Sequence, residues 1–378
     1  MLKTIRVTNF KAIASAELEL SPLHLLIGPN DSGKTSFLEA IAAISRSLDH
    51  ALGMTFLGRW NGQQLVHSGS GGSKVSIEAD IDGSIAGTYR LEAEFPTADR
   101  TVTLKSADFD GKSIAYGNVS TLTGHPSRPA MLDQQHFAIA DSLKQNLCPC
   151  WYLRWSARNL SLPATLSPER HLRIAGNGFG LPTMLDDLLG ESRENFGRLE
   201  KTFCSQFPGV VGIELKQEKA FDSPVDDPEQ TLSLKPGNGK QLYFRLENGA
   251  SIPAPQAAEG MLYTLAYLAI SYLPDPPKIL LVEEPENGIH PGRVREIVRL
   301  LRKMTEQSPA IQIIMTSHSP YLVDEMKPNE VTWCRRVNGS ITTQRLDTNE
   351  TVRQQQDLFE LGEIWSNYLD PSSELTIP

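Results

Sequence analysis

The residues best suited to chemistry form one run near the start of the 378-residue chain, GPNDSGKTS, from Gly28 to Ser36. The run fits the G-x-x-x-x-G-K-[ST] pattern of phosphate-binding loops. Its glycines let the backbone bend and approach a phosphate closely, and the backbone N–H groups at the start of a helix attract anions. The predicted nucleotide-binding residues are Gly28, Pro29, Asn30, Asp31, Ser32, Gly33, Lys34, Thr35 and Ser36.

Two side chains of this run have distinct chemical roles. The ammonium group of Lys34 can reach the β- and γ-phosphates of a nucleoside triphosphate and stabilise the charge that develops there. The hydroxyl of Thr35 is a suitable ligand for Mg²⁺. We therefore predict a catalytic role for Lys34 and a metal-binding role for Thr35.

A pair of carboxylates follows a second apolar run, KILLVEEP, from Lys278 to Pro285. A buried parallel strand that ends in acids places them at the carboxyl edge of its sheet, where α/β folds bind their ligands. Glu283 is then predicted to hold Mg²⁺, and Glu284 to polarise the attacking water as a general base. The alternative is a strand that ends in two solvated acids with no catalytic role. The presence of a phosphate-binding loop in the same chain disfavours this alternative.

Two further segments fit the same chemistry. The apolar run from Ile311 to Met315 ends in Thr-Ser-His-Ser-Pro, and His318 is predicted to hydrogen-bond the γ-phosphate or to orient the water. The segment Ala257–Gly260 opens an apolar helix and provides either an anion site or a plain helix cap. Residues 2–8 and 16–20 alternate and predict two strands, a first hairpin around a turn at residues 9–12. In this turn, Phe10 and Lys11 fit equally well a nucleotide contact or a buried hairpin tip.

These residues need elements that bring them together. The run from His24 to Ile27 has the apolar character of a buried parallel strand, and apolar residues recur at helical spacing from Phe37 to Ile44. Residues 74–81, 88–95 and 101–104 alternate and predict an antiparallel meander, which needs a sheet of its own. Residues 181–207 predict two helices, and residues 217–239 are polar and predict a flexible loop.

The expected fold class is α/β: a mixed or parallel core sheet with an additional antiparallel β-lobe and a short helical insertion. Three consecutive parts are expected. Residues 1–155 form an N-terminal lobe, residues 156–235 the insertion with its loop, and residues 236–378 a C-terminal lobe.

Net charge, apolar runs and cysteine spacing indicate the ligands and the cellular location to be expected. The net charge of −9 does not favour nucleic-acid binding by the whole surface. The longest apolar run, Met261 to Leu273, is too short to cross a bilayer, and the N-terminus has a strand pattern in place of a signal peptide. The four cysteines lack zinc spacing and are expected to be reduced thiols, so a cytoplasmic protein is predicted; they are Cys148, Cys150, Cys204 and Cys334.

Taken in order, these motifs resemble those of the ABC-type ATPase heads, and most closely the RecF/OLD group with its SMC-like members. The resemblance extends over nearly the whole chain. It rests on VTNFKA at the start, GPNDSGKTSFLEA as the Walker A segment, EEPENGIHP as Walker B with the D-loop, TSHSP as the switch histidine and LGEIW near the end. This set is typical of the ABC-type P-loop NTPase superfamily.

The resemblance implies a head that binds ATP and Mg²⁺ and forms a homodimer. In such a dimer the nucleotide lies between the P-loop of one head and the signature motif of the other. Glu259 and Gly260, with Ala258, occupy the signature position, and His290 occupies the D-loop position. Two residues depart from the usual pattern. Glu283 stands where transporters have Asp, and Ala258 replaces the signature serine, which removes a hydrogen-bond donor to the γ-phosphate.

Three functional hypotheses follow. The first is a cytoplasmic bacterial ATPase that dimerises on ATP and regulates a separate effector protein, such as a nuclease in a defence system. The segment after His318 is too short for the nuclease domain of OLD proteins, which places the effector on another polypeptide. The second is a RecF- or SMC-like DNA-repair ATPase that binds duplex DNA directly. The third is a nucleotide sensor with little turnover.

Overall fold

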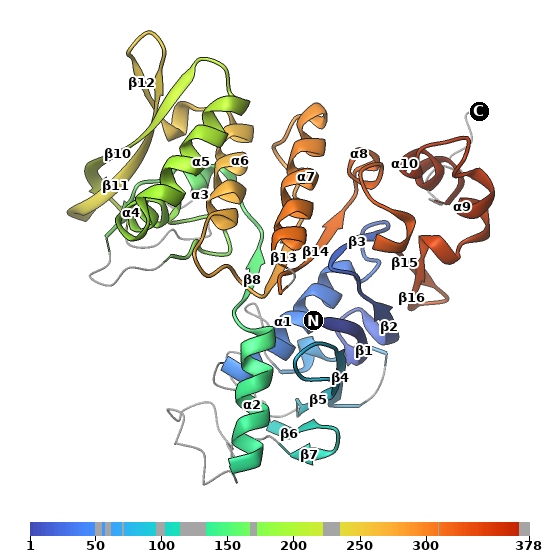
Figure 1. Ribbon diagram of the computed structural model, residues 1–378. Helices are drawn as coiled ribbons and strands as arrows, with labels where there is room; N and C mark the ends of the chain where they lie inside the picture. Colours follow the sequence, from blue (N-terminus) through green and yellow to red (C-terminus); the bar gives the residue numbers. More distant parts are fainter. Residues whose placement is uncertain are drawn as a thin grey trace. The chain divides into compact units, whose positions relative to one another are not determined.

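The computed structural model describes residues 1–49, 55–56, 62–69, 72–95, 103–113, 134–166, 172–221, 235–308 and 310–369 (Figure 1). The chain folds into two compact units. Unit 1 contains Met1–Tyr152, Pro277–Glu284 and Thr305–Pro378, and unit 2 contains Leu153–Pro276 and Pro285–Met304. Each unit is described separately below.

The core sheet of unit 1 has the strand order β16-β15-β3-β14-β13-β8. β3 pairs in parallel with β14 and β15, β14 pairs in parallel with β13, and β16 is antiparallel to β15. All residues of β3 and β14 are buried, as expected for parallel strands that are covered on both faces. The bounds are β3 Leu23–Ile27, β8 Cys150–Leu153, β13 Ile279–Glu283, β14 Gln312–Ser317, β15 Val331–Val337 and β16 Ser340–Arg345.

The division into units differs from the three consecutive parts expected from the sequence. The first boundary lies at Tyr152, close to the expected residue 155. The C-terminal part, however, is not one unit, because β13 and β14 pair with β3 from the start of the chain. A parallel sheet joins strands that lie far apart in sequence, so its members cannot be grouped by chain order.

The second sheet of unit 1 is antiparallel, with the order β2-β1-β4-β5-β6-β7. It confirms the predicted meander and shows that the first hairpin belongs to the same sheet. Burial alternates along β4, so one face of the sheet meets the core and the other meets solvent. The bounds are β1 Leu2–Phe10, β2 Ile13–Glu19, β4 Lys74–Ile81, β5 Gly87–Glu94, β6 Thr103–Phe109 and β7 Lys112–Ser113. Residues 101–102 of the prediction lie outside the described residues.

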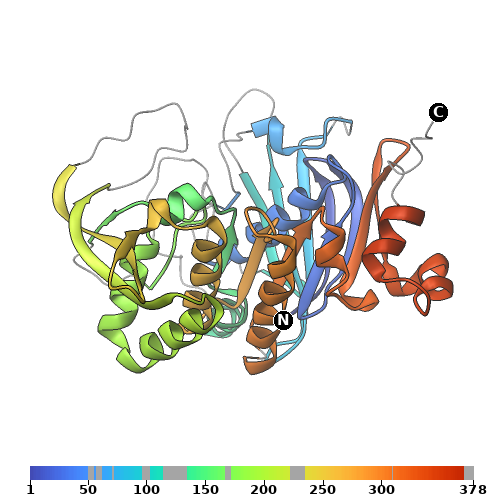
Figure 2. The same cartoon turned by 90° about the horizontal axis from the view of Figure 1, so that it is seen from above.

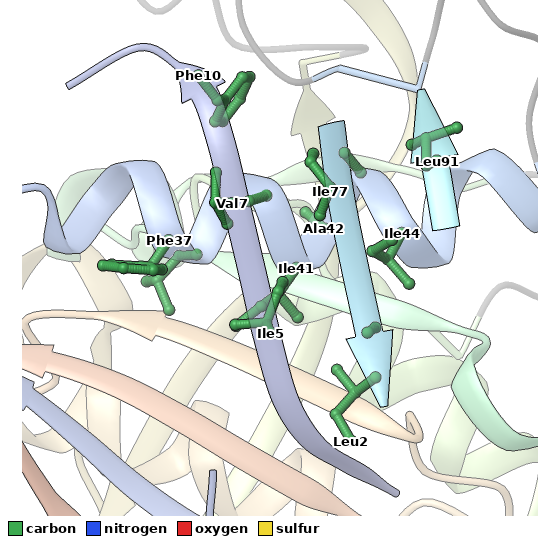
Figure 3. Close-up of a cluster of buried hydrophobic side chains, with 14 of the residues drawn as sticks. Leu2, Ile5, Val7, Phe10, Phe37, Ile41, Ala42, Ile44, Ile77 and Leu91 are labelled. Carbon is green, nitrogen blue, oxygen red and sulfur yellow. The ribbon is translucent and has the colours of Figure 1, made fainter. Parts of the chain in front are cut away.

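Helix α1, Lys34–Asp49, contacts both sheets of unit 1. Figure 3 shows its side chains Phe37, Ile41 and Ile44 among residues of β1 and β4. The helix is apolar around most of its circumference, which is typical of a helix buried on all sides. Its alanines, Ala40, Ala42 and Ala43, are fully covered and leave room for close packing of the two layers.

A buried glutamine connects the two sheets. The side chain of Gln312, in β14, accepts a hydrogen bond from Leu2 N at 2.9 Å and donates one to Leu2 O at 2.8 Å. Its amide thus pairs both backbone groups of a β1 residue, as a neighbouring strand would. This contact fixes the start of β1 beside the core sheet.

The remaining elements of unit 1 are the 14-residue helix α2 and several short helices. In Figures 1 and 2 the C-terminal helices lie beside β15 and β16, and η5 contacts β15. The β15–β16 turn has Asn338 and Gly339 at positive φ, the geometry of a type I′ hairpin turn. The elements are η2 Gly62–Leu65, α2 Gln134–Leu147, α8 Pro320–Val323, η4 Pro328–Glu330, η5 Leu346–Thr348, α9 Glu350–Gln355, α10 Leu361–Ile364 and η6 Trp365–Leu369.

The tip of the first hairpin has a structural role. Phe10 is only 1% exposed, and its ring centroid lies 6.0 Å from that of Phe56. Lys11 forms an ion pair with Glu39 of α1. Of the two alternatives for Phe10, the structure shows the buried hairpin tip. Lys11 connects this hairpin to helix α1 through its ion pair.

Unit 2 is built on a ribbon formed by β10 and β11, with α4 against β11 and α5 against β10. The two predicted helices are confirmed. Its elements are α3 Ala157–Ser161, β9 Ala164–Thr165, α4 Leu181–Glu191, α5 Arg193–Gln206, β10 Val210–Ala220, β11 Lys235–Leu246, β12 Ser251–Pro253, η3 Ala254–Gln256, α6 Glu259–Ser271 and α7 Pro291–Gln307, which enters unit 1 at Thr305.

The predicted loop at residues 217–239 is wrong at both ends. Gln217 pairs with Lys240, and Glu218 pairs with Gly239. These ends of the ribbon carry polar side chains and lack the apolar alternation that marks a half-buried strand. Residues 222–234 lie outside the described residues. Among the described residues, no helix is both long enough and apolar enough to span a bilayer.

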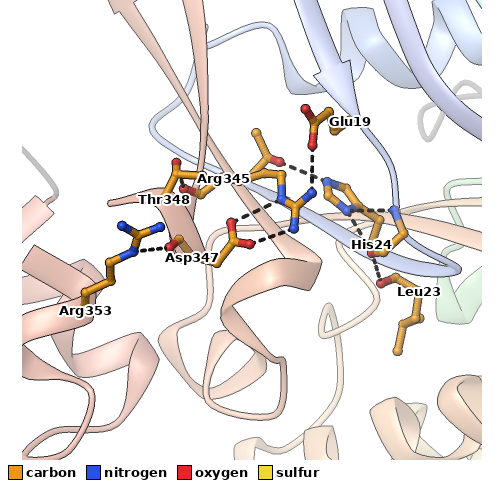
Figure 4. Close-up of polar contacts among 9 residues, drawn as sticks. Glu19, Leu23, His24, Arg345, Asp347, Thr348 and Arg353 are labelled. Atoms are coloured by element: carbon orange, nitrogen blue, oxygen red, sulfur yellow. Dashed lines mark hydrogen bonds and ion pairs between the residues drawn. The ribbon is translucent and has the colours of Figure 1, made fainter. Parts of the chain in front are cut away.

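A polar cluster at the start of β3 surrounds His24, which is 0% exposed (Figure 4). The ring Nδ1 accepts a hydrogen bond from Ser21 N at 3.3 Å, and Nε2 lies 3.0 Å from Thr332 Oγ1. Burial, with a smaller contribution from the positive charge of Arg345, lowers the pKa of His24 to about 3. The imidazole is therefore neutral in the folded protein, and Arg345 is paired with Glu19 and Asp347.

Lowering the pH from about 7.5 to about 5 should destabilise the protein through His24. The unfolded imidazole takes up a proton below about pH 6.5, whereas the folded one does so only near pH 3. The contribution of the neutral His24 to the free energy of unfolding is therefore fully present above pH 6.5. It decreases as the pH falls from 6.5 towards 3, and the loss is on the order of 2 kcal/mol at pH 5. Urea unfolding at both pH values measures the loss.

The variant His24→Gln should show a smaller loss between the two pH values than the wild type. The matched control is the same change at His290, whose side chain is exposed. Equal pH dependence in the wild type and His24→Gln would contradict the assignment.

Candidate functional site

The predicted phosphate-binding loop connects β3 to α1, so the strand–loop–helix context of the motif is present. Gly28 has φ +140° and Gly33 has φ +85°. A Cβ atom at Gly28 would lie 2.0 Å from the carbonyl oxygen of Cys334 in β15. Only glycine fits this position, because the neighbouring strand passes directly beside the loop.

Lys34 folds back over the loop. Its Nζ donates to the carbonyl oxygens of Gly28 at 2.7 Å and Pro29 at 2.8 Å, and the side chain is only 6% exposed. The two carbonyl oxygens hold the ammonium group of Lys34 above the loop. When a nucleotide binds, phosphate oxygens can replace these carbonyls as hydrogen-bond acceptors. Of the other loop residues, Ser32 and Ser36 are buried, while Asn30, Asp31 and Thr35 are exposed.

The two predicted carboxylates differ in backbone geometry. Glu283 is the last residue of β13, and its Oε1 accepts a hydrogen bond from the hydroxyl of Tyr152 at 2.7 Å. Glu284 has φ +47°, a left-handed conformation that is uncommon for a residue with a side chain. Its N–H donates to Thr316 O at 3.0 Å, which holds this turn against the end of β14. Strained residues of this kind cluster at functional sites.

The strand register places the predicted residues at one edge. Glu283 is opposite Thr316, and Ser317 is opposite Ile27, so β13, β14 and β3 end at the same level. Two strand spacings, about 10 Å, separate the ends of β3 and β13. His318 follows β14, and its Nε2 lies 3.8 Å from Glu284 Oε1. The P-loop, both glutamates and the histidine thus meet at the carboxyl edge of the core sheet.

The residues of this edge suit Mg²⁺. Thr35 offers an exposed hydroxyl at the start of α1, and Glu283 offers a carboxylate at the end of β13. Both are hard oxygen donors, which Mg²⁺ prefers. Among the described residues, no group of three or more His, Cys, Asp or Glu forms a metal cage. A nucleotide-bound Mg²⁺ needs no such cage, because phosphates and waters supply most of its ligands.

The remaining predicted residues belong to unit 2. Glu259 is the first residue of α6, and a Cβ atom added at Gly288 would lie 2.7 Å from its Oε2. The signature-like segment and the D-loop segment are therefore in contact. His290 is exposed, and its Nδ1 accepts a hydrogen bond from Gly292 N at 3.2 Å at the start of α7. Ala258 is the N-cap of α6 and provides no side-chain cap.

Two residues beside the loop were missed in the sequence. Arg336, in β15, forms an ion pair with Asp31 at 3.2 Å, and Ile341, in β16, would lie 3.2 Å from a Cβ atom at Gly33. The β15–β16 hairpin thus contacts the loop at both ends. The Asn-Gly dipeptide at the turn was the available signal, since it marks a hairpin, but it does not say what the hairpin contacts.

A third missed residue is Tyr152, in β8, because no pattern in the sequence indicates its contact with Glu283. Near the same edge, burial raises the pKa of the Cys334 thiol to about 12, so this thiol is neutral beside Gly28. None of the four cysteines forms a disulfide.

Comparison with known families and proteins supports this description. Residues 1–113 match a family described as "AAA ATPase domain", and residues 166–324 match one described as "AAA domain, putative AbiEii toxin, Type IV TA system". An OLD nuclease from Thermus scotoductus is 27% identical over 340 residues, which cover 86% of this chain and 60% of the relative. The chain thus spans less than two thirds of that relative.

Solved structures show the same fold. A crystal structure of an SMC head bound to the C-terminal winged-helix domain of ScpA aligns with a TM-score of 0.56 and 12% identity, covering 93% of this chain and 99% of the other. The fold is that of an ABC-type P-loop NTPase, with a mixed sheet and antiparallel sheets. Together with the sequence matches, this fold makes the chain similar to the ABC-type ATPases of the OLD/SMC group.

Proposed function

We propose that the chain hydrolyses ATP in a Mg²⁺-dependent manner. One observation carries the proposal: the register of β3, β14 and β13, which brings the loop of Lys34, the two glutamates and His318 to one sheet edge. Each of these groups has a place in phosphoryl transfer. The match to AAA ATPase families supports the same activity.

Each residue of the site has its own role in the proposed hydrolysis. The loop N–H groups and Lys34 hold the phosphates, and Thr35 and Glu283 would hold Mg²⁺, which supplies further charge stabilisation. Glu284 accepts a proton from the attacking water while the water oxygen bonds to the γ-phosphorus and the bond to the β-phosphate oxygen breaks. His318, 3.8 Å from Glu284, orients this carboxylate or the γ-phosphate.

The proposed working form is a homodimer in which ATP lies between two heads. Glu259 and Gly260 would approach the γ-phosphate bound by the other head, and His290 would lie at the same interface. Closure of this dimer would regulate a separate effector protein, such as a nuclease. The similarity to an OLD nuclease supports a link to nuclease action. A cytoplasmic location fits the four free thiols.

The variant Glu284→Gln should lower ATP turnover by at least about 100-fold, because an amide cannot accept the proton from water. ATP binding should persist, so an ATP-bound dimer should accumulate. Steady-state turnover and light scattering after size-exclusion chromatography measure the two effects. Glu296→Gln, at an exposed position of α7, is the matched control. Turnover at the wild-type rate in Glu284→Gln would refute the role of this base.

Arg336 should support nucleotide binding by neutralising Asp31. The Asp31 carboxylate is 76% exposed within a loop that cradles phosphates, so it repels the ligand unless the arginine is present. Arg336→Ala should weaken ATP affinity by roughly threefold. The double variant Asp31→Asn with Arg336→Ala should restore it, since Asn tolerates positive φ. Equilibrium binding of a fluorescent ATP analogue tests the pair, and failure of the second change to restore affinity would contradict the argument.

Direct binding of duplex DNA is a second candidate. Helix α7 exposes Arg295, Arg299 and Lys303, and these residues fall on neighbouring turns of the helix. A basic stripe of this kind suits contact with a phosphate backbone. DNA binding that requires ATP and weakens steeply with salt would favour this candidate over regulation of a protein effector.

A sensor with little turnover is the third candidate, and Ala258 favours it because the α6 N-terminus has no side-chain cap. Ala258→Ser should raise turnover by roughly fivefold, since one hydroxyl donor to the γ-phosphate contributes on the order of 1 kcal/mol. Ala257→Ser, one residue earlier, is the matched control. Turnover above background in the wild type would exclude the sensor, and no gain in Ala258→Ser would contradict the proposed role of position 258.

A further inference from the structure

The hydroxyl of Tyr152 donates to Oε1 of Glu283 at 2.7 Å, and both residues belong to unit 1. The two strands that carry them are neighbours in the core sheet. At their beginnings, Lys278 N donates to Pro149 O at 3.0 Å. Since Tyr152 and Glu283 lie later in both strands and are again in contact, β8 and β13 run in the same direction. The phenol therefore reaches the carboxylate at the functional edge of the sheet.

The phenol itself is held on a well-anchored segment. Trp151 and Leu153, the neighbours of Tyr152 in β8, are buried. This burial limits the positions that the Tyr152 hydroxyl can take.

A hydrogen bond to one oxygen restricts how a glutamate carboxylate can turn. Glu283 has three side-chain torsions and is only half-buried, so without a partner it would sample several orientations. Outer partners of metal-binding carboxylates fix the orientation of the ligand, and their loss lowers metal affinity. A phenol is well suited to this task, because it donates a hydrogen bond without adding charge near the metal.

We propose that Tyr152 is a positioning residue, which holds the Glu283 carboxylate in the orientation that binds Mg²⁺ with the nucleotide. The inference rests on the proposed function, in which Glu283 is a metal ligand. Tyr152 contacts neither nucleotide nor metal in this scheme and acts only through Glu283. Its contribution is therefore confined to the Mg²⁺-dependent part of nucleotide binding.

The test uses the full chain and a fluorescent, slowly hydrolysed ATP analogue, titrated with Mg²⁺ and, separately, bound in excess EDTA. Tyr152→Phe removes a single oxygen atom. It should raise the half-saturating Mg²⁺ concentration by about tenfold, while affinity in EDTA stays at the wild-type value. The matched control is Tyr243→Phe, which removes another phenol–glutamate hydrogen bond, to Glu218 in unit 2. This control should leave the Mg²⁺ dependence unchanged.

A double-mutant cycle with Glu283→Gln tests whether Tyr152 acts through Glu283. The amide oxygen of glutamine can still accept from the phenol but is a poorer ligand for Mg²⁺. In the Glu283→Gln background, Tyr152→Phe should cause no further rise in the half-saturating Mg²⁺ concentration. A full additional rise would show that the two residues act independently and would overturn the inference.

The remaining outcomes separate this inference from the proposed function. If Mg²⁺ does not affect nucleotide binding by the wild type, the proposed function itself fails. If the wild type depends on Mg²⁺ and Tyr152→Phe has the same half-saturation, only the positioning role is wrong. If Tyr152→Phe weakens binding equally in EDTA, the hydrogen bond serves the structure of the fold and the inference is again overturned.

Discussion

The parallel register of β3, β14 and β13 is the constraint on which the rest of the site depends. Hydrogen bonds between these strands set Ile27 level with Ser317 and Thr316 level with Glu283. A slip of one residue would turn every side chain of a strand to the opposite face of the sheet. All three strands are almost entirely buried, so such a slip would expose apolar side chains and would be very costly. The register therefore fixes the positions of the loop, the glutamates and the histidine relative to one another along the strand direction.

Tight packing around the phosphate-binding loop is the second requirement. Its first glycine lies against the backbone of β15, its last lies against Ile341, and its lysine is held by the loop's own carbonyls. Helix α1 continues the loop between the two sheets of unit 1 and is buried along its length. The anion-binding end of this helix is thus attached to the buried core of the unit, which limits its movement.

Each of the three acids at the site has a nearby partner. Asp31 has Arg336, Glu283 accepts from Tyr152, and Glu284 lies near His318. Glu284 has a left-handed backbone, and the two successive acids have different partners, Tyr152 for Glu283 and His318 for Glu284. Strain of this kind persists only where the surroundings hold it, and here Thr316 does so through a backbone hydrogen bond.

The sequence alone determined the local chemistry: the glycine–lysine loop, the acid-ended strand, the polar turn with His318 and the antiparallel meander all follow from residue types and short spacings. Only the tertiary structure decided which distant segments become neighbours. It joined Arg336 to Asp31 and Tyr152 to Glu283, grouped β13 and β14 with the N-terminal strand, and formed strands from part of the polar segment at 217–239. Such pairings arise because parallel strands and solvated ribbons are stabilised by partners far away in the chain, which no local pattern specifies.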